Sequence, residues 1–173
     1  MPKPRKYNDE NLVAMFRLAA DLRKQMISAG FTDNGGAIHS AERILHLLGQ
    51  RICFPELAHL NNLRMLPNAP FSEAALTAYQ NGQQVFIEHV NPHRALTRLA
   101  IELIESGKSD EEFRAFVRDN YQLALLTHEE TTRLNRLNRT KIEKDRLGRA
   151  GIKLAAGVSP TASVTPASSQ SAA

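Results

Sequence analysis

Apolar residues recur every three or four positions in one short segment after another, and each segment ends near a glycine or a proline. This punctuated spacing predicts short helices that each bury one face, because polar residues occupy the remaining positions. Ser109 and Thr127 each precede a Glu by three residues, the spacing of a capping box, and so predict two further helix starts. The expected helices cover residues 9–29, 37–48, 55–64, 72–79 and 93–106, with others beginning after Ser109 and Thr127.

Two short apolar runs differ from this helical pattern. Residues 84–90 contain Val85-Phe86-Ile87, and residues 123–126 read Leu-Ala-Leu-Leu. Uninterrupted apolar runs of this length are typical of buried strands. We therefore expect a mainly α protein, a helical single domain with one small two-stranded β element.

The length of 173 residues suits one domain, and 42% hydrophobic residues suffice for a proper core. We expect residues 1–7 to form a flexible N-terminus and residues 8–154 to form the mostly helical globular domain. Residues 155–173 contain mainly Ala, Ser, Thr and Pro, without a charge or a large side chain. Such a segment buries too little apolar surface to offset its chain entropy, so we expect a disordered tail.

A single cysteine, Cys53, excludes a disulfide framework within the chain and a cysteine-rich zinc site. Its apolar neighbours predict a buried, inert thiol. No run is apolar enough to cross a membrane and no signal peptide is evident, so we expect no membrane partner and a cytoplasmic location.

Positive charge is concentrated near the end of the predicted domain. The formal net charge is +4, and eight basic and two acidic residues between Arg133 and Lys153 give that segment +6, which leaves −2 for the rest. A basic helix beginning after Thr127 on a slightly acidic body predicts a nucleic-acid partner, although a solvated face with ordinary charge pairs is the alternative. The predicted nucleic-acid contacts are Arg94, Arg133, Arg136, Arg139, Lys141, Lys144, Arg146 and Arg149.

The sequence Glu88-His89-Val90-Asn91-Pro92 follows the apolar run Val85-Phe86-Ile87 and lies at the end of the first predicted strand. A carboxylate can hold a metal ion, and an imidazole can take a proton from water, so this pair could form a hydrolytic site. The structural alternative is a hydrogen-bonded polar pair ahead of a helix that Pro92 begins. His93 and Arg94 come next, at a helix start where free N–H groups favour an anion.

This motif, followed by a second strand and a capped basic helix, resembles the HNH nuclease family with its ββα-metal site. The resemblance covers about residues 88–135. It implies that His89 is the catalytic general base and that Glu88 binds a divalent metal (Mg, Mn or Zn), with His128 and Asn135 completing the site. The chain departs from the family pattern at Thr131 and Asn135, where the helix commonly presents histidines.

A second polar cluster lies on the predicted helix 37–48. His39, Glu42, Arg43 and His46 share one face, so His39 and Glu42 could flank a metal or a phosphate that Arg43 steadies. The alternative is a solvated face with a contact between Glu42 and His46. These residues are secondary candidates.

Two functions follow from these patterns. The first is a nucleic-acid-interacting protein that acts as a metal-dependent, HNH-like phosphodiesterase. The second is a non-catalytic helical adaptor, or a nucleic-acid-binding component of a larger complex, that docks on a protein partner and needs no cofactor.

Overall fold

The computed structural model describes residues 8–32 and 35–156, so residues 1–7, where a flexible N-terminus was expected, and 157–173, most of the expected tail, lie outside the described residues. The described chain is mainly helical with one two-stranded sheet, which confirms the expected fold class. The elements in order are α1 (Asp9–Ser28), α2 (Gly35–Cys53), the 3-10 helix η1 (Leu60–Met65), α3 (Glu73–Gln80), β1 (Phe86–His89), α4 (His93–Glu105), α5 (Asp110–Asn120), β2 (Leu123–Leu126), α6 (His128–Arg136) and α7 (Arg146–Arg149).

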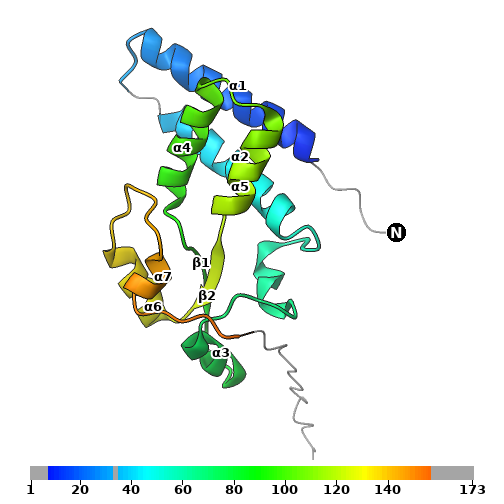
Figure 1. The fold of residues 1–173 in the computed structure, drawn as a ribbon, viewed down its shortest axis with the longest axis vertical. Coiled ribbons are helices and arrows are strands. Elements are labelled where there is room, and N and C mark those ends of the chain that lie inside the picture. The colour runs from blue at the N-terminus through cyan, green and yellow to red at the C-terminus, as the bar shows by residue number, and fades with distance from the viewer. Residues whose placement is uncertain (1–7, 33–34, 157–173) are drawn as a thin grey trace, which may run out of the picture.

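Four helices, α1, α2, α4 and α5, pack against one another in the upper part of Figure 1. Each turns one apolar stripe inward, and the rings of Phe16 and Phe113 stack with centroids 4.9 Å apart in this core. Both phenylalanines are fully buried, so each contributes about 1.5–3 kcal/mol of apolar burial. This packing places the predicted polar face of α2 beside the start of α4.

The helix starts agree with the cap residues in the sequence. The side chains of Ser109 and Thr127 each accept a hydrogen bond from the amide of the third helical residue, and the Glu side chain at that position accepts one from the amide of the cap residue. Glu130, the third residue of α6, is buried and also accepts a hydrogen bond of 2.6 Å from the Ser72 hydroxyl. Since Ser72 in turn caps α3, one carboxylate links the starts of two helices.

Three predicted boundaries are wrong. The helix expected to stop at Leu48 continues to Cys53, because Gly49 packs its bare backbone against the Tyr121 ring instead of ending the helix. The helix expected over 55–64 is a 3-10 helix of six residues, Leu60–Met65.

The third wrong boundary concerns the basic helix. α6 ends at Arg136, where Leu137 is extended and the Asn138 side chain accepts a hydrogen bond from the Thr140 amide. Such a turn competes with the helix for backbone donors. The remaining basic residues therefore lie on the 137–145 loop, on α7 and beyond it.

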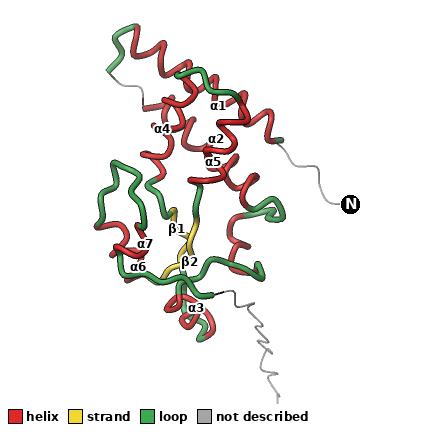
Figure 2. The backbone as a smooth tube through the Cα atoms, viewed as in Figure 1, coloured by secondary structure: helices red, strands yellow, loops and turns green. Residues whose placement is uncertain are grey.

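The two strands pair antiparallel, with Glu88 opposite Ala124 and His89 opposite Leu123. Side chains alternate between the faces of a strand, so β2 contributes to two hydrophobic clusters. Leu123 and Leu125 belong to the core with the four helices, whereas Ala124 and Leu126 pack with Leu134 of α6. Figure 2 shows the sheet between the four packed helices α1, α2, α4 and α5 and the smaller part that contains α6. Glu88 and His89 consequently point to opposite faces of this sheet.

Among the described residues, no helix combines the length and apolar character needed to span a lipid bilayer.

Candidate functional site

Three histidines from separate elements meet at the end of β1. His46 comes from α2, His89 is the last residue of β1, and His93 is the first residue of α4; one ring nitrogen from each lies within 4.8 Å of the other two. His46 Nδ1 is 3.3 Å from His89 Nε2, and the rings of His89 and His93 have centroids 4.7 Å apart. Among the described residues, this is the one group of three or more potential metal-ligating side chains at such spacing.

The turn between β1 and α4 is held by hydrogen bonds to two other segments, the connection from α5 to β2 and the start of α7. The Val90 amide donates to the Gln122 carbonyl at 3.0 Å, and the buried Asn91 side chain donates to the Asn120 carbonyl at 2.8 Å. Arg146 Nε donates to the Val90 carbonyl, also at 2.8 Å. With Pro92 leading into α4, this anchored turn fixes His89 and His93 on either side of it.

Burial controls the protonation of the cluster. It lowers the pKa of His46 to about 4, with help from His93 and Arg43, and the pKa of His89 to about 3, with help from His93 and His46. Burial also lowers the pKa of His93, although Glu42 opposes this shift. All three imidazoles are therefore neutral near pH 7, each with one lone pair that can accept a proton or bind a metal.

Tyr121 closes one side of the cluster. Its hydroxyl oxygen is 3.1 Å from His46 Nδ1, and its ring lies across the His89 ring with centroids 5.4 Å apart. The side chain is buried, and burial raises the pKa of the phenol. The Tyr121 ring can pack here because residue 49 is a glycine; a Cβ on residue 49 would overlap the ring.

A small pocket of about 120 Å³ opens beside the histidines. It is lined by Glu88, His89, Pro92, His93, Leu134, Asn135, Arg139 and Arg146. The volume is below the 300–1,000 Å³ of drug-sized ligand sites and suits a single phosphate group. Burial raises the pKa of the Glu88 carboxyl, and Thr131 and Arg139 partly offset that shift.

The structure brings together two of the three metal ligands that the resemblance implied. Glu88 of β1 and Asn135 of α6 line the same pocket as His89. His128 is exposed at the start of α6, beside the Phe86 ring, and lines a separate, more open pocket of about 540 Å³. Phe86 and His89 are the two ends of β1, about 10 Å apart along the strand.

The secondary cluster on α2 is an ion-pair network around Glu42. Arg94 Nε is 2.6 Å from one carboxylate oxygen, and His39 Nδ1 is 3.0 Å from the other. Burial acts to raise the pKa of Glu42, but Arg94 and His39 outweigh it. The predicted partner of Glu42 was His46; the observed partners are Arg94 and His39, while Arg43 is exposed. Arg94 is thus engaged by a carboxylate.

The predicted phosphate contacts divide into two groups. Arg146 is 3% exposed and donates to the backbone carbonyls of Val90, Asn138 and Leu134, so its guanidinium supports the fold. Arg149 pairs with Glu143. The exposed cations of α6 and the following loop are Arg133, Arg136, Arg139, Lys141 and Lys144. Among them, Arg133 donates from Nε to the Ala150 carbonyl at 3.0 Å.

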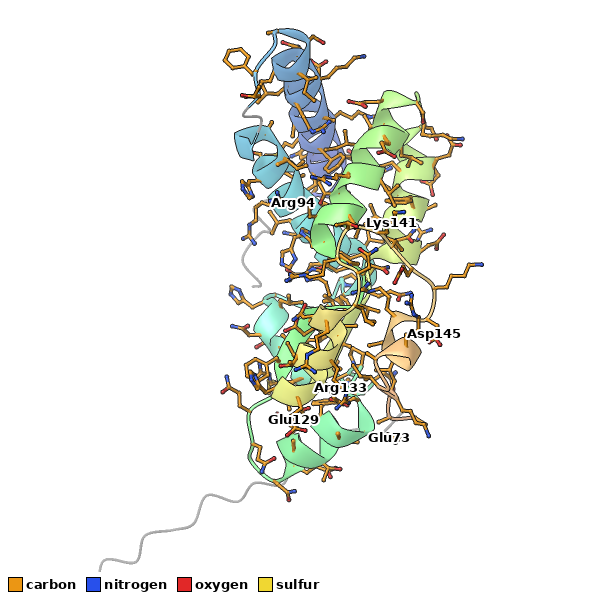
Figure 3. The ribbon with its side chains drawn as sticks, turned by 90° about the vertical axis from the view of Figure 1, so that its left-hand side faces the viewer. Glu73, Arg94, Glu129, Arg133, Lys141 and Asp145 are labelled. Atoms are coloured by element: carbon orange, nitrogen blue, oxygen red, sulfur yellow. The ribbon has the colours of Figure 1, made fainter. Side chains whose placement is uncertain are left out.

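The surface cations come from several elements. Figure 3 shows Arg94 on α4, Lys141 on the 137–145 loop and Arg133 on α6, three separate elements. In Figure 1 the loop extends from α6 back towards α4. Arg139 on this loop lines the pocket itself and contributes its positive charge there.

The convergence of His46 with His89 is the feature that sequence reasoning missed. The two residues are 43 positions apart, and the helical pattern placed His46 on a polar face without indicating what would cover it. The spacing of His89 and His93 across a proline was the available signal for a local pair. Comparison of the chain with family models, with curated proteins and with solved structures gave no significant match.

Proposed function

We propose that this protein is a divalent-metal-dependent phosphodiesterase that acts on nucleic acid at the pocket at the end of β1. The observation that carries the proposal is the composition of that pocket. A carboxylate, two neutral imidazoles, an amide and two arginines line a space of phosphate size. The two strands pair antiparallel and α6 packs on them, as the resemblance to HNH enzymes implies, although α4 and α5 lie between β1 and β2 in the chain.

The cationic side of the pocket would bind the phosphate. Arg139 offers a guanidinium, which suits phosphate oxygens, and the first turn of α4 has free amide groups and no acidic residue. Arg133, Arg136 and Lys141 on the adjoining surface would contact flanking phosphates without reading base sequence. This part of the interaction should weaken steeply with salt.

His89 is proposed as the general base. When His89 donates its Nε2 hydrogen to His46, its Nδ1 lone pair is free to accept a proton. A pKa of about 3 makes the buried imidazole a weak base, but an anionic phosphate bound beside it would raise the pKa. Water attacks phosphorus, its proton passes to His89, the bond to the leaving oxygen breaks, and that oxygen takes a proton from solvent.

Glu88 and Asn135 would hold the metal ion. Carboxylate and amide oxygens suit Mg²⁺ or Mn²⁺, and Mg²⁺ in particular keeps several of its waters and completes its shell with substrate phosphate oxygens. Such an ion supplies charge stabilisation to the phosphoryl oxygens. Glu88 and His89 point to opposite faces of the strand. The Glu88 carboxylate can therefore hold an ion while the His89 imidazole stays free to accept a proton.

A cleavage assay on fluorescent duplex DNA and single-stranded RNA, with Mg²⁺ or Mn²⁺, tests this proposal. His89→Gln should lower the rate constant by about 10²–10⁴-fold, the usual range for a lost acid–base group. Glu88→Gln should also lower it, because it removes the anionic ligand of the metal ion. His128→Gln is the matched control, because it removes an exposed imidazole that lies in the other pocket, and it should keep the wild-type rate. Equal rates for wild type and His89→Gln would refute the assignment.

The adaptor is the second candidate, and an exposed apolar stripe favours it. Met15, Leu18 and Leu22 on α1 are 39%, 69% and 50% exposed and follow the spacing of one helix face. Such a face is typical of a protein–protein contact. Tight nucleic-acid binding without cleavage under any metal, combined with loss of a protein partner on Leu18→Glu, would favour the adaptor.

A further inference from the structure

The nitrogen atoms of the histidine cluster have the spacing of a metal coordination shell. Two nitrogens bound at about 2.0–2.1 Å to a tetrahedral zinc ion lie about 3.3 Å from each other. His46 Nδ1 and His89 Nε2 are 3.3 Å apart, and one ring nitrogen from each of the three histidines lies within 4.8 Å of the other two. Little side-chain movement is needed to bring all three onto one ion.

Hydrogen bonding leaves this cluster incompletely satisfied. His46 Nδ1 has two neighbours, His89 Nε2 and the Tyr121 hydroxyl, but a neutral ring nitrogen can make only one strong hydrogen bond. His93 Nε2 is buried and has no hydrogen-bond partner among the described residues. Buried nitrogens in this state point to a ligand that accepts several lone pairs at once.

We propose that His46, His89 and His93 form a binding site for a borderline transition-metal ion, with Zn²⁺ as the principal candidate. Three neutral imidazoles suit Zn²⁺, Co²⁺ or Ni²⁺ and disfavour Mg²⁺, which requires oxygen ligands. Three imidazoles would leave a fourth position for water, and the Tyr121 hydroxyl is 3.1 Å from His46 Nδ1. The nearby Glu42 carboxylate, which already acts on His93, offsets part of the positive charge.

The ligands come from α2, β1 and α4, so a bound ion would tie three elements together. An ion bound to both His46 and His93 would close a long loop of the chain. The unfolded chain has no such link. Binding should therefore stabilise the folded protein in proportion to metal concentration.

This site does not depend on the proposed phosphodiesterase, but it competes with it. A metal on His89 Nε2 requires the hydrogen to sit on Nδ1, which removes the lone pair that would take the proton from water. If both assignments hold, micromolar Zn²⁺ inhibits Mg²⁺-dependent cleavage. Zinc binding without inhibition would remove the general-base role and leave the metal site intact.

The test is a titration of the metal-free protein with Zn²⁺ by calorimetry and with Co²⁺ by visible absorption, in the absence of nucleic acid. We expect micromolar or tighter binding of one ion and the intense absorption of tetrahedral Co²⁺. His46→Asn and His93→Asn should each weaken binding at least 100-fold. His59→Asn and His128→Asn, which replace exposed histidines outside the cluster, should change it less than twofold.

A measurement on the unaltered protein covers the case in which a cluster variant fails to fold. Imidazole nitrogen chemical shifts distinguish metal-bound from free rings, and three of the six histidines should shift together at one equivalent of Zn²⁺. The proposal is overturned if the wild type binds no Zn²⁺ below 100 µM. It is equally overturned if the shifted rings are those of exposed histidines.

Discussion

Acidification should destabilise this protein through its buried histidines. Their pKa values in the folded state lie below the ordinary value of 6.5, so the unfolded chain binds more protons than the folded chain below that pH. The stability that depends on neutral imidazoles is fully present above pH 6.5. It is lost progressively as the pH falls towards the folded values of about 4 for His46 and about 3 for His89.

The magnitude follows from these two values. At pH 5.0, proton binding favours the unfolded form of each histidine roughly 30-fold over the folded form, which equals about 2 kcal/mol. Partial solvent exposure of the rings reduces this towards about 1 kcal/mol each. Two contributions of about 1–2 kcal/mol each give a combined loss of about 2–4 kcal/mol, out of the 5–15 kcal/mol typical of a domain. The raised pKa of Glu88 acts in the opposite direction, because the folded chain binds a proton at this carboxyl more readily than the unfolded chain does, and it reduces the loss.

Urea denaturation at pH 7.5 and pH 5.0, with a chelator to remove metals, measures the effect. His89→Gln should lose about a third to a half of the pH dependence, because the amide does not titrate while His46 and His93 remain. His128→Gln should retain all of it, since that side chain is exposed on α6. An identical fall in the free energy of unfolding for wild type and His89→Gln would show that the cluster is not responsible.

Two further substitutions test the packing around the site. Gly49→Ala places a methyl group into the Tyr121 ring, so it should cost about 1–3 kcal/mol in urea denaturation, and an unchanged midpoint would contradict the close approach. Glu130→Ala removes the carboxylate that bonds Ser72 and the Thr127 amide, and it should cost about 1–3 kcal/mol. Its exposed neighbour provides the control, because Glu129→Ala should stay within about 0.5 kcal/mol of wild type.

The sequence predicted elements whose signals are local. A cap residue and its Glu three positions later, as at Ser109 and Thr127, define a helix start without reference to the rest of the chain. Gly49 shows where this reasoning fails. Glycine usually ends a helix, but here the absence of a side chain serves a contact with Tyr121, 72 positions further along the chain, and α2 continues.

The site was predictable only in part, for the same reason. Glu88, His89 and the proline form a local motif, and their position at a strand end was expected and is observed. His46 joins them because α2 packs against α4 and α5, a contact that no periodicity within α2 reveals. Arg146 shows the reverse error: its place in a basic segment suggested a surface role, whereas the β1–α4 turn needs a donor and takes its guanidinium.

The position of the sheet explains why one pocket combines unlike donors. β2 is buried on both faces, so its partner β1 borders the helical core on one side and the smaller cluster with α6 on the other. A residue pair at the end of β1 must then divide between two environments. Glu88 faces α6, where oxygen donors and Arg139 favour a hard cation and a phosphate, while His89 faces α2, where buried nitrogens favour a softer ion. Metal selectivity at this site should therefore depend on which face of the strand supplies the ligands, and substitutions at Glu88 and at His46 should affect the two kinds of ion separately.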